Sequence, residues 1–224
     1  MVTHSHVIDV NDPKFLSSAF GYFALALLMT AGGAFLGFWM LANNPNLIVN
    51  PFILYGAIIA ELVLVFTSHL WSRNLPFGYG MFMLFSLLSG FTLMPILLLA
   101  GATGGAAIII KALISSVSVF AAAALYGWTT DRNLVGMGGF LMMTLFGLIV
   151  LGILGIFFPW SNTIELVVSG FTVVLFAGFT MVDIQRIQKT PGLNPLLAAM
   201  SLYLNFINIF TSILRFMMAM NNRR

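Results

Sequence analysis

Long, uncharged apolar segments recur through the chain and are separated by gaps of only a few residues. Of its 224 residues, 60% are hydrophobic and 7% are charged, whereas a soluble domain has about 25% charged residues. A helix needs about 20 apolar residues to cross a bilayer. Because no gap is long enough to hold a soluble domain, the sequence predicts an all-helical integral membrane protein. A transmembrane barrel is excluded, because its strands would alternate polar and apolar residues.

Seven membrane spans are predicted, and the breaks between them carry turn sequences such as SRNLP, AGATGG and KTPGLNP. The predicted spans are 17–41, 47–71, 77–99, 105–127, 134–158, 163–187 and 193–219. The chain is predicted to have three parts: a short polar N-terminal tail (1–16), a single seven-helix membrane domain (17–220) and a basic C-terminal end (221–224).

The basic residues predict the orientation. With seven spans, one side of the membrane receives most of them: Lys14, Arg73, Arg132, Arg186 and Lys189. Cytoplasmic loops are enriched in lysine and arginine, so the N-terminus is predicted to be cytoplasmic and the C-terminus external. Arg223 and Arg224 oppose this assignment, and a re-entrant last segment would leave both ends inside. The scattered basic residues do not form a nucleic-acid footprint.

Small residues and one proline bear on helix packing. Gly33 and Gly37 have the GxxxG spacing that lets membrane helices approach closely. Pro95 is expected to kink the third span or to end its regular part.

The last span carries a polar stripe within the stretch SLYLNFINIFTSILRF. Its polar positions are four, three, four and three residues apart, so they share one helical face: Ser201, Asn205, Asn208, Ser212 and Arg215. The span is therefore expected to pack against other helices. The alternative to a functional site is a set of hydrogen bonds that only hold helices together.

Ionisable residues at membrane depth are costly and usually face the interior of a bundle or water. Besides Arg215, the candidates within spans are Glu61, Lys111, Glu165 and Asp183. An alternative for Asp183 is a solvated helix-end carboxylate paired with Arg186. An alternative for Glu61 is a buried ion pair, with Arg215 as one candidate partner.

Four segments carry a resemblance to a known family. SLYLNFINIFTSILRF closely resembles the last-helix signature of the transmembrane Bax inhibitor motif family, the Bax inhibitor-1-like proteins. FAGFTMVDIQRIQ resembles that family's sixth-helix motif, GYGMFMLFSLLSGFTLMPI its third helix, and ALYGWTTDRNLVGMGGFLMM its fourth helix, loop and fifth-helix start. The short tail and loops resemble those of a bacterial member, which implies the bacterial inner membrane.

The resemblance implies a seven-helix bundle with the last helix at its centre and a pH-sensitive calcium leak. In the family, an aspartate in each of the last two helices is proposed to share a proton and gate the path. The first maps to Asp183 and the second to Asn205, where this sequence departs from the family. Glu61 and Arg215 match the family's second-helix acid and seventh-helix arginine, and Arg73 falls near the basic end of the second helix.

The asparagine changes the chemistry of the implied pair. Two nearby carboxylates titrate as a coupled unit, whereas Asp183 and Asn205 contain only one titrating group. Calcium prefers several oxygen ligands, usually with more than one carboxylate, so Asp183 is a weak calcium ligand candidate. The hypothesis is a cation leak channel with altered pH gating and calcium as the transported ion.

A second class of function is a non-conducting regulator. The resemblance implies that such a protein could partner a membrane-bound AAA protease of the FtsH type or modulate stress and cell death. An enzyme is not expected, because no HExxH motif is present and the only intramembrane histidine is His69. No cofactor is expected, and the lipid bilayer is an expected partner.

Overall fold

The computed structural model describes residues 13–44, 51–158, 160–190 and 193–221, and every regular element in these ranges is a helix. The predicted tail residues 1–12 and the terminal pair Arg223 and Arg224 lie outside the described residues. The elements are α1 (Pro13–Asn43), α3 (Pro51–Phe66), α4 (Ser68–Trp71), α5 (Leu75–Thr129), the 3₁₀ helix η1 (Val135–Met137), α6 (Gly138–Phe157), α7 (Asn162–Lys189) and α8 (Pro195–Asn221).

Five of the described helical segments are long and apolar enough to cross a membrane, namely those in α1, α5, η1 with α6, α7 and α8. This confirms the helical membrane class that composition predicts. The predicted span 47–71 corresponds to two described helices, α3 and the short α4, which adjoin at Thr67. The predicted spans 77–99 and 105–127 lie together in α5.

Helix α5 is interrupted at Gly105, inside the turn sequence AGATGG. Its 55 residues would reach about 80 Å at 1.5 Å per residue, far more than the ~30 Å hydrocarbon core. Gly105 has φ 65° and ψ −170°, which are not helical values. Pro95 lies inside the helix, so the proline does not end it, and the non-helical backbone falls at the glycine instead.

We expect Gly105→Ala to destabilise the protein by about 1–3 kcal/mol, because only glycine adopts this backbone region readily. A methyl group at Gly105 would have nothing within 4 Å, so the effect would come from the backbone alone. Thermal unfolding in detergent measures it. Gly101→Ala is the matched control, since that site is equally open but helical. Equal melting temperatures for the two variants would contradict the expectation.

The chain divides into two compact units, one formed by Met1–Leu97 with Thr190–Tyr203 and the other by Leu98–Lys189 with Leu204–Arg224. In the first unit, α1 packs closely against the first part of α5. A Cβ at Gly33 would fall on the carbonyl oxygen of Leu87, and one at Gly90 would fall on that of Thr30. This confirms that Gly33 allows close helix packing.

Within the first unit, Asn194 ties the start of α8 to the turn that follows α4. Its Oδ1 accepts a hydrogen bond from the Leu196 amide at 2.9 Å, and its Nδ2 donates to the Ser72 carbonyl oxygen at 2.8 Å. Asparagine before a helix and proline at its first position both favour helix initiation. The NP pair in KTPGLNP therefore begins the helix that carries the polar stripe.

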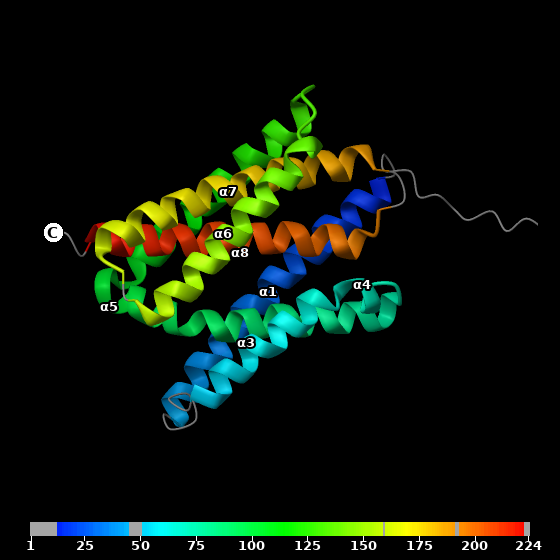
Figure 1. The fold of residues 1–224 in the computed structure, drawn as a ribbon. Coiled ribbons are helices and arrows are strands. Elements are labelled where there is room, and N and C mark those ends of the chain that lie inside the picture. The colour runs from blue at the N-terminus through cyan, green and yellow to red at the C-terminus, as the bar shows by residue number, and fades with distance from the viewer. Residues whose placement is uncertain (1–12, 45–50, 159, 191–192, 222–224) are drawn as a thin grey trace, which may run out of the picture. The chain divides into compact units, whose positions relative to one another are not determined.

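In the second unit, α7 and the Leu204–Asn221 part of α8 run side by side in opposite directions (Figure 1). Asp183, near the end of α7, contacts Asn205, whereas Glu165, near its start, contacts Arg215. Residues of α6 and α7, together with Leu134 before η1, form an apolar cluster of Leu134, Leu141, Leu175 and Val182.

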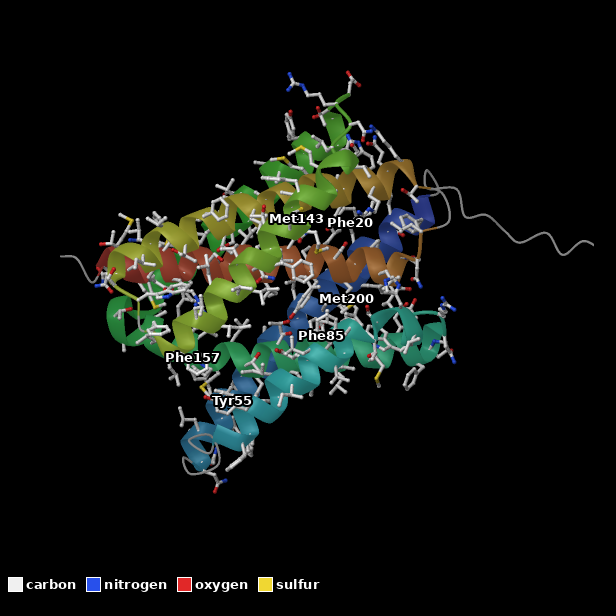
Figure 2. All side chains as sticks on the ribbon, in the orientation of Figure 1. Phe20, Tyr55, Phe85, Met143, Phe157 and Met200 are labelled. Carbon is white, nitrogen blue, oxygen red and sulfur yellow. The ribbon has the colours of Figure 1, made fainter. Side chains whose placement is uncertain are left out.

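Apolar side chains cover much of the exterior. Met143 and Phe157 of α6, both labelled in Figure 2, are 76% and 72% exposed. In the apolar stretch that η1 and α6 form, only 6% is buried by the rest of the protein, whereas 67% of the apolar stretch of α8 is buried. Since soluble monomers rarely expose large contiguous apolar patches, these faces suit contact with lipid.

Candidate functional site

The aspartate and the asparagine singled out in the sequence lie in contact. Asn205 Nδ2 of α8 donates a hydrogen bond of 2.8 Å to Asp183 Oδ2 of α7. Asp183 is 9% exposed and Asn205 is 4% exposed. The two side chains meet because α7 and α8 are antiparallel and both present a polar residue at this level.

The other carboxylate oxygen of Asp183 faces Arg186, one helical turn further along α7. Arg186 Nη1 lies 3.8 Å from Oδ1, and the arginine side chain is 48% exposed while that of Asp183 is 12% exposed. The ion pair with Arg186, which the sequence offered as the alternative for Asp183, therefore exists alongside the contact with Asn205, but the carboxylate is buried rather than solvated. The ion pair reaches from the buried carboxylate toward the surface of the helix.

The geometry sets what the pair can do with protons. An asparagine NH₂ donates hydrogen bonds and a carboxylate oxygen accepts them, so Asn205 is the donor and Asp183 the acceptor of this contact. Asn205 has no proton to release, which leaves one titrating group in the pair. Among the described residues, no three His, Cys, Asp or Glu side chains gather into a metal-binding group.

A second charged contact lies where α7 begins. Arg215 Nη1 of α8 is 3.7 Å from Glu165 Oε1, and both side chains line a cavity of about 240 Å³. Asn208 and Ser212, from the predicted polar stripe, line the same cavity. The Asn208–Arg215 part of the stripe therefore borders an open space rather than only joining helices.

Glu61 has hydroxyl partners within the first unit. Its Oε1 accepts a hydrogen bond of 3.0 Å from Thr92 Oγ1, and Ser89 also hydrogen-bonds its carboxylate. The sequence suggests Arg215 as one candidate partner for Glu61, whereas the ion pair that the structure shows for Arg215 is with Glu165. The acid of α3 is thus held by hydroxyl groups of α5.

Sequence reasoning missed Tyr203, which extends this hydroxyl cluster. Its hydroxyl lies 2.6 Å from Thr30 Oγ1 and also hydrogen-bonds Ser86 and Ser89. Tyr203 is fully buried. The ring of Phe85 packs edge-on against its ring, with 5.7 Å between the two ring centroids. A tyrosine two residues before Asn205 was the available signal, but it reads as an ordinary apolar position in such a helix.

The remaining predicted residues have local roles. Ser201 Oγ donates to the Ala198 carbonyl oxygen at 3.0 Å, and Asn208 Nδ2 donates to that of Leu204 at 2.8 Å. Arg73 is exposed in the turn between α4 and α5. Both stripe residues therefore satisfy part of their hydrogen bonding within their own helix, as serines and asparagines in membrane helices often do.

Comparisons with known proteins agree over nearly the whole chain. A family model described as "Inhibitor of apoptosis-promoting Bax1" matches residues 12–223. The inner membrane protein YbhL of Escherichia coli K12 is 32% identical over 218 residues, covering 90% of this chain and 89% of that protein. An uncharacterized protein of Helicobacter pylori J99 is 33% identical over 204 residues, covering 90% of this chain and 85% of its own. An uncharacterized membrane protein of Streptococcus pyogenes serotype M1 is 32% identical over 227 residues, covering 95% of this chain and 97% of its own.

Proposed function

The chain belongs to the family of inhibitors of apoptosis-promoting Bax1, and from this premise we propose that it is a cation leak channel of a bacterial inner membrane. Calcium is the expected ion. Its response to pH is altered, because one member of the family's proposed proton-sharing pair is Asn205. The inner-membrane assignment follows the E. coli relative, whose name places that protein there.

The proposed topology has seven crossings around the last helix. Helices α3 and α4 form one crossing, since together they run from Pro51 to Trp71. Helix α5 forms two, divided at Gly105. The basic residues Arg132, Arg186 and Lys189 then share the cytoplasmic side with the N-terminus.

The contact between Asn205 and Asp183 is the observation that carries the proposal. A buried carboxylate at the end of an apolar helix is costly, and here it faces a neutral amide at 2.8 Å. In a pair of carboxylates at this distance, one proton would be shared and the two groups would titrate together. With asparagine, one group titrates and Asp183 provides the only carboxylate of the pair for a passing cation.

Calcium flux into proteoliposomes between pH 5 and 8 tests this function. We expect the wild type to leak with little pH dependence and Asn205→Asp to show a steep one, because the substitution creates a coupled pair. Asn208→Asp is the matched control, since it adds a carboxylate to the same helix at a side chain bonded to Leu204. It is expected to leave the pH profile shallow.

Two results would contradict the proposal, the first its altered pH response and the second its channel function. A steep two-proton pH dependence in the wild type that Asp183→Asn abolishes would show that the proton switch does not need a second aspartate. Absence of flux in both wild type and Asn205→Asp, with folded and inserted protein, would remove the channel function itself.

The loss of the second carboxylate also favours a non-conducting alternative. In that case the fold is kept for interaction with a membrane-bound AAA protease or another membrane protein. Co-purification of such a protease with the wild-type chain, together with no flux, supports the alternative. Flux without co-purification supports the channel.

A further inference from the structure

A cavity of about 240 Å³ lies between α6, α7 and α8 in the second unit, and the proton-pair chemistry above does not use it. It is lined by apolar residues of α6, including Leu145 and Ile149, and by polar residues of α7 and α8, including Thr172 and Asn208. One wall is therefore suited to hydrocarbon and the other to a polar group. Figure 1 shows the three helices that form it.

The charges at this cavity have opposite sign and are only loosely paired. Glu165 and Arg215 are 3.7 Å apart, and their side chains are 31% and 55% exposed. Both also line an adjoining hollow with Trp160 and Gly155. A partly exposed pair contributes little to stability, so both groups keep donors or acceptors for a ligand that carries both charges.

A separate apolar groove lies beside the cavity, on neighbouring faces of α6 and α7. It has a volume of about 500 Å³ and is lined by Gly147, Leu151 and Phe171, and it shares Leu148 and Val168 with the cavity. The groove can take a hydrocarbon chain, whereas the Glu165–Arg215 end can take a charged group. The two hollows together fit an amphiphile.

The position of the charged end matches the membrane–water boundary. Glu165 lies in the first turn of α7, where that candidate span begins. Trp160 lies just before this helix, and its ring would contact a Cβ placed at Gly155 of α6. Tryptophan is enriched at the interfaces of membrane proteins, so the charged groups lie at the depth of lipid headgroups.

We propose that this cavity and groove bind one phospholipid with a zwitterionic, primary-amine headgroup. Arg215 binds the phosphate, because a guanidinium matches phosphate oxygens with two donors. Glu165 accepts a hydrogen bond from the ammonium group, and an acyl chain lies along α6 and α7. The proposal goes beyond the channel function and does not depend on it, since binding is measured without flux.

Native mass spectrometry of delipidated full-length protein in detergent tests the site. The probes are phosphatidylethanolamine, phosphatidylglycerol and phosphatidylcholine with identical acyl chains. We expect one tightly held phosphatidylethanolamine and about tenfold weaker binding of the other two, since neither offers an ammonium N–H to Glu165. Equal affinity for all three lipids would overturn the proposal.

Charge variants identify the partners. Glu165→Gln is expected to remove the preference for phosphatidylethanolamine over phosphatidylglycerol, whereas Arg215→Gln weakens both lipids about tenfold. Lys111→Gln is the matched control, because Lys111 is an exposed cation of α5 outside this cavity. A folded Glu165→Gln protein that keeps the wild-type preference would refute the assignment.

A steric variant keeps the test decisive if the charge variants do not fold. Gly152 lines the cavity, and a Cβ there meets nothing within 4 Å, so Gly152→Leu fills space without a clash at its first atom. It is expected to weaken all lipids, whereas Gly139→Leu, at another open site on α6, is not. Unchanged binding in Gly152→Leu would place the lipid elsewhere.

Soluble glycerophosphoethanolamine separates a lipid from a free zwitterion. The headgroup alone is expected to bind far more weakly than the lipid, because it lacks the chain that fills the groove. Equal affinity of the headgroup and the lipid would assign the site to a small soluble molecule and overturn the lipid proposal.

Discussion

Gly33→Ala is expected to destabilise the protein by about 3 kcal/mol or more, near the upper end for overpacking a tight contact. The added methyl group would fall on the backbone carbonyl of Leu87, and a backbone atom cannot move aside as a side-chain tip can. Helices α1 and α5 would have to separate. Gly90→Ala should have a similar effect, because its Cβ would fall on the Thr30 carbonyl oxygen.

The neighbouring residue supplies the control for this prediction. A Cβ at Gly32 meets nothing within 4 Å, and alanine is favoured over glycine in a helix by about 0.5–1 kcal/mol. Gly32→Ala should therefore be neutral or stabilising. Thermal unfolding in detergent, followed by the loss of a monodisperse peak, measures both variants. If the two alanines behave alike, α1 and α5 do not approach as closely as the structure has them.

The close approach of α1 and α5 shows what spacing can and cannot predict. Gly33 and Gly37 predict a face for close packing, and Gly33 does lie against Leu87. The partner surface around Gly90 was not predicted, because a single glycine in SLLSGF has no spacing to mark it. The pattern identifies one helix of a contact, whereas the partner depends on how the chain folds back.

The Asp183–Asn205 contact was foreseen because a family resemblance supplies register. Helical periodicity places Asn205 on a polar face, but it does not tell which residue of another helix lies opposite. The 2.8 Å contact follows from the antiparallel arrangement of α7 and α8. The ion pair of Glu165 with Arg215 follows from the same arrangement, yet spacing alone left Glu61 as a suggested partner for that arginine.

The hydroxyl cluster around Tyr203 lay beyond sequence reasoning for a different reason. Its members Thr30 and Ser86 each fit an apolar helix, since a hydroxyl can bond to a carbonyl of the preceding turn. Ser86 makes such a bond to Phe82. The sequence pattern does not distinguish a hydroxyl that bonds only to the backbone of its own helix from one that also bonds to Tyr203. That distinction depends on distances between helices.

Gln185 of α7 fastens the segment that leads from α5 to α6. It is fully buried, and its Oε1 accepts a hydrogen bond of 2.7 Å from the Leu134 amide. Its Nε2 donates to the Arg132 carbonyl oxygen at 2.8 Å. Two backbone groups that are far away in the sequence therefore depend on one side chain.

Gln185→Leu is expected to destabilise the protein by about 3 kcal/mol, because each buried group left without a partner costs about 1–3 kcal/mol. A leucine of similar size fills the space but bonds neither Leu134 nor Arg132. Thermal unfolding in detergent measures the loss, and faster proteolysis after Arg132 should accompany it, since the released segment becomes accessible. Gln188→Leu, one turn later on the same helix and less buried, is the control. A Gln185→Leu protein as stable and as protease-resistant as that control would mean that the segment is held by its apolar contacts around Leu134, and that the amide bonds add nothing.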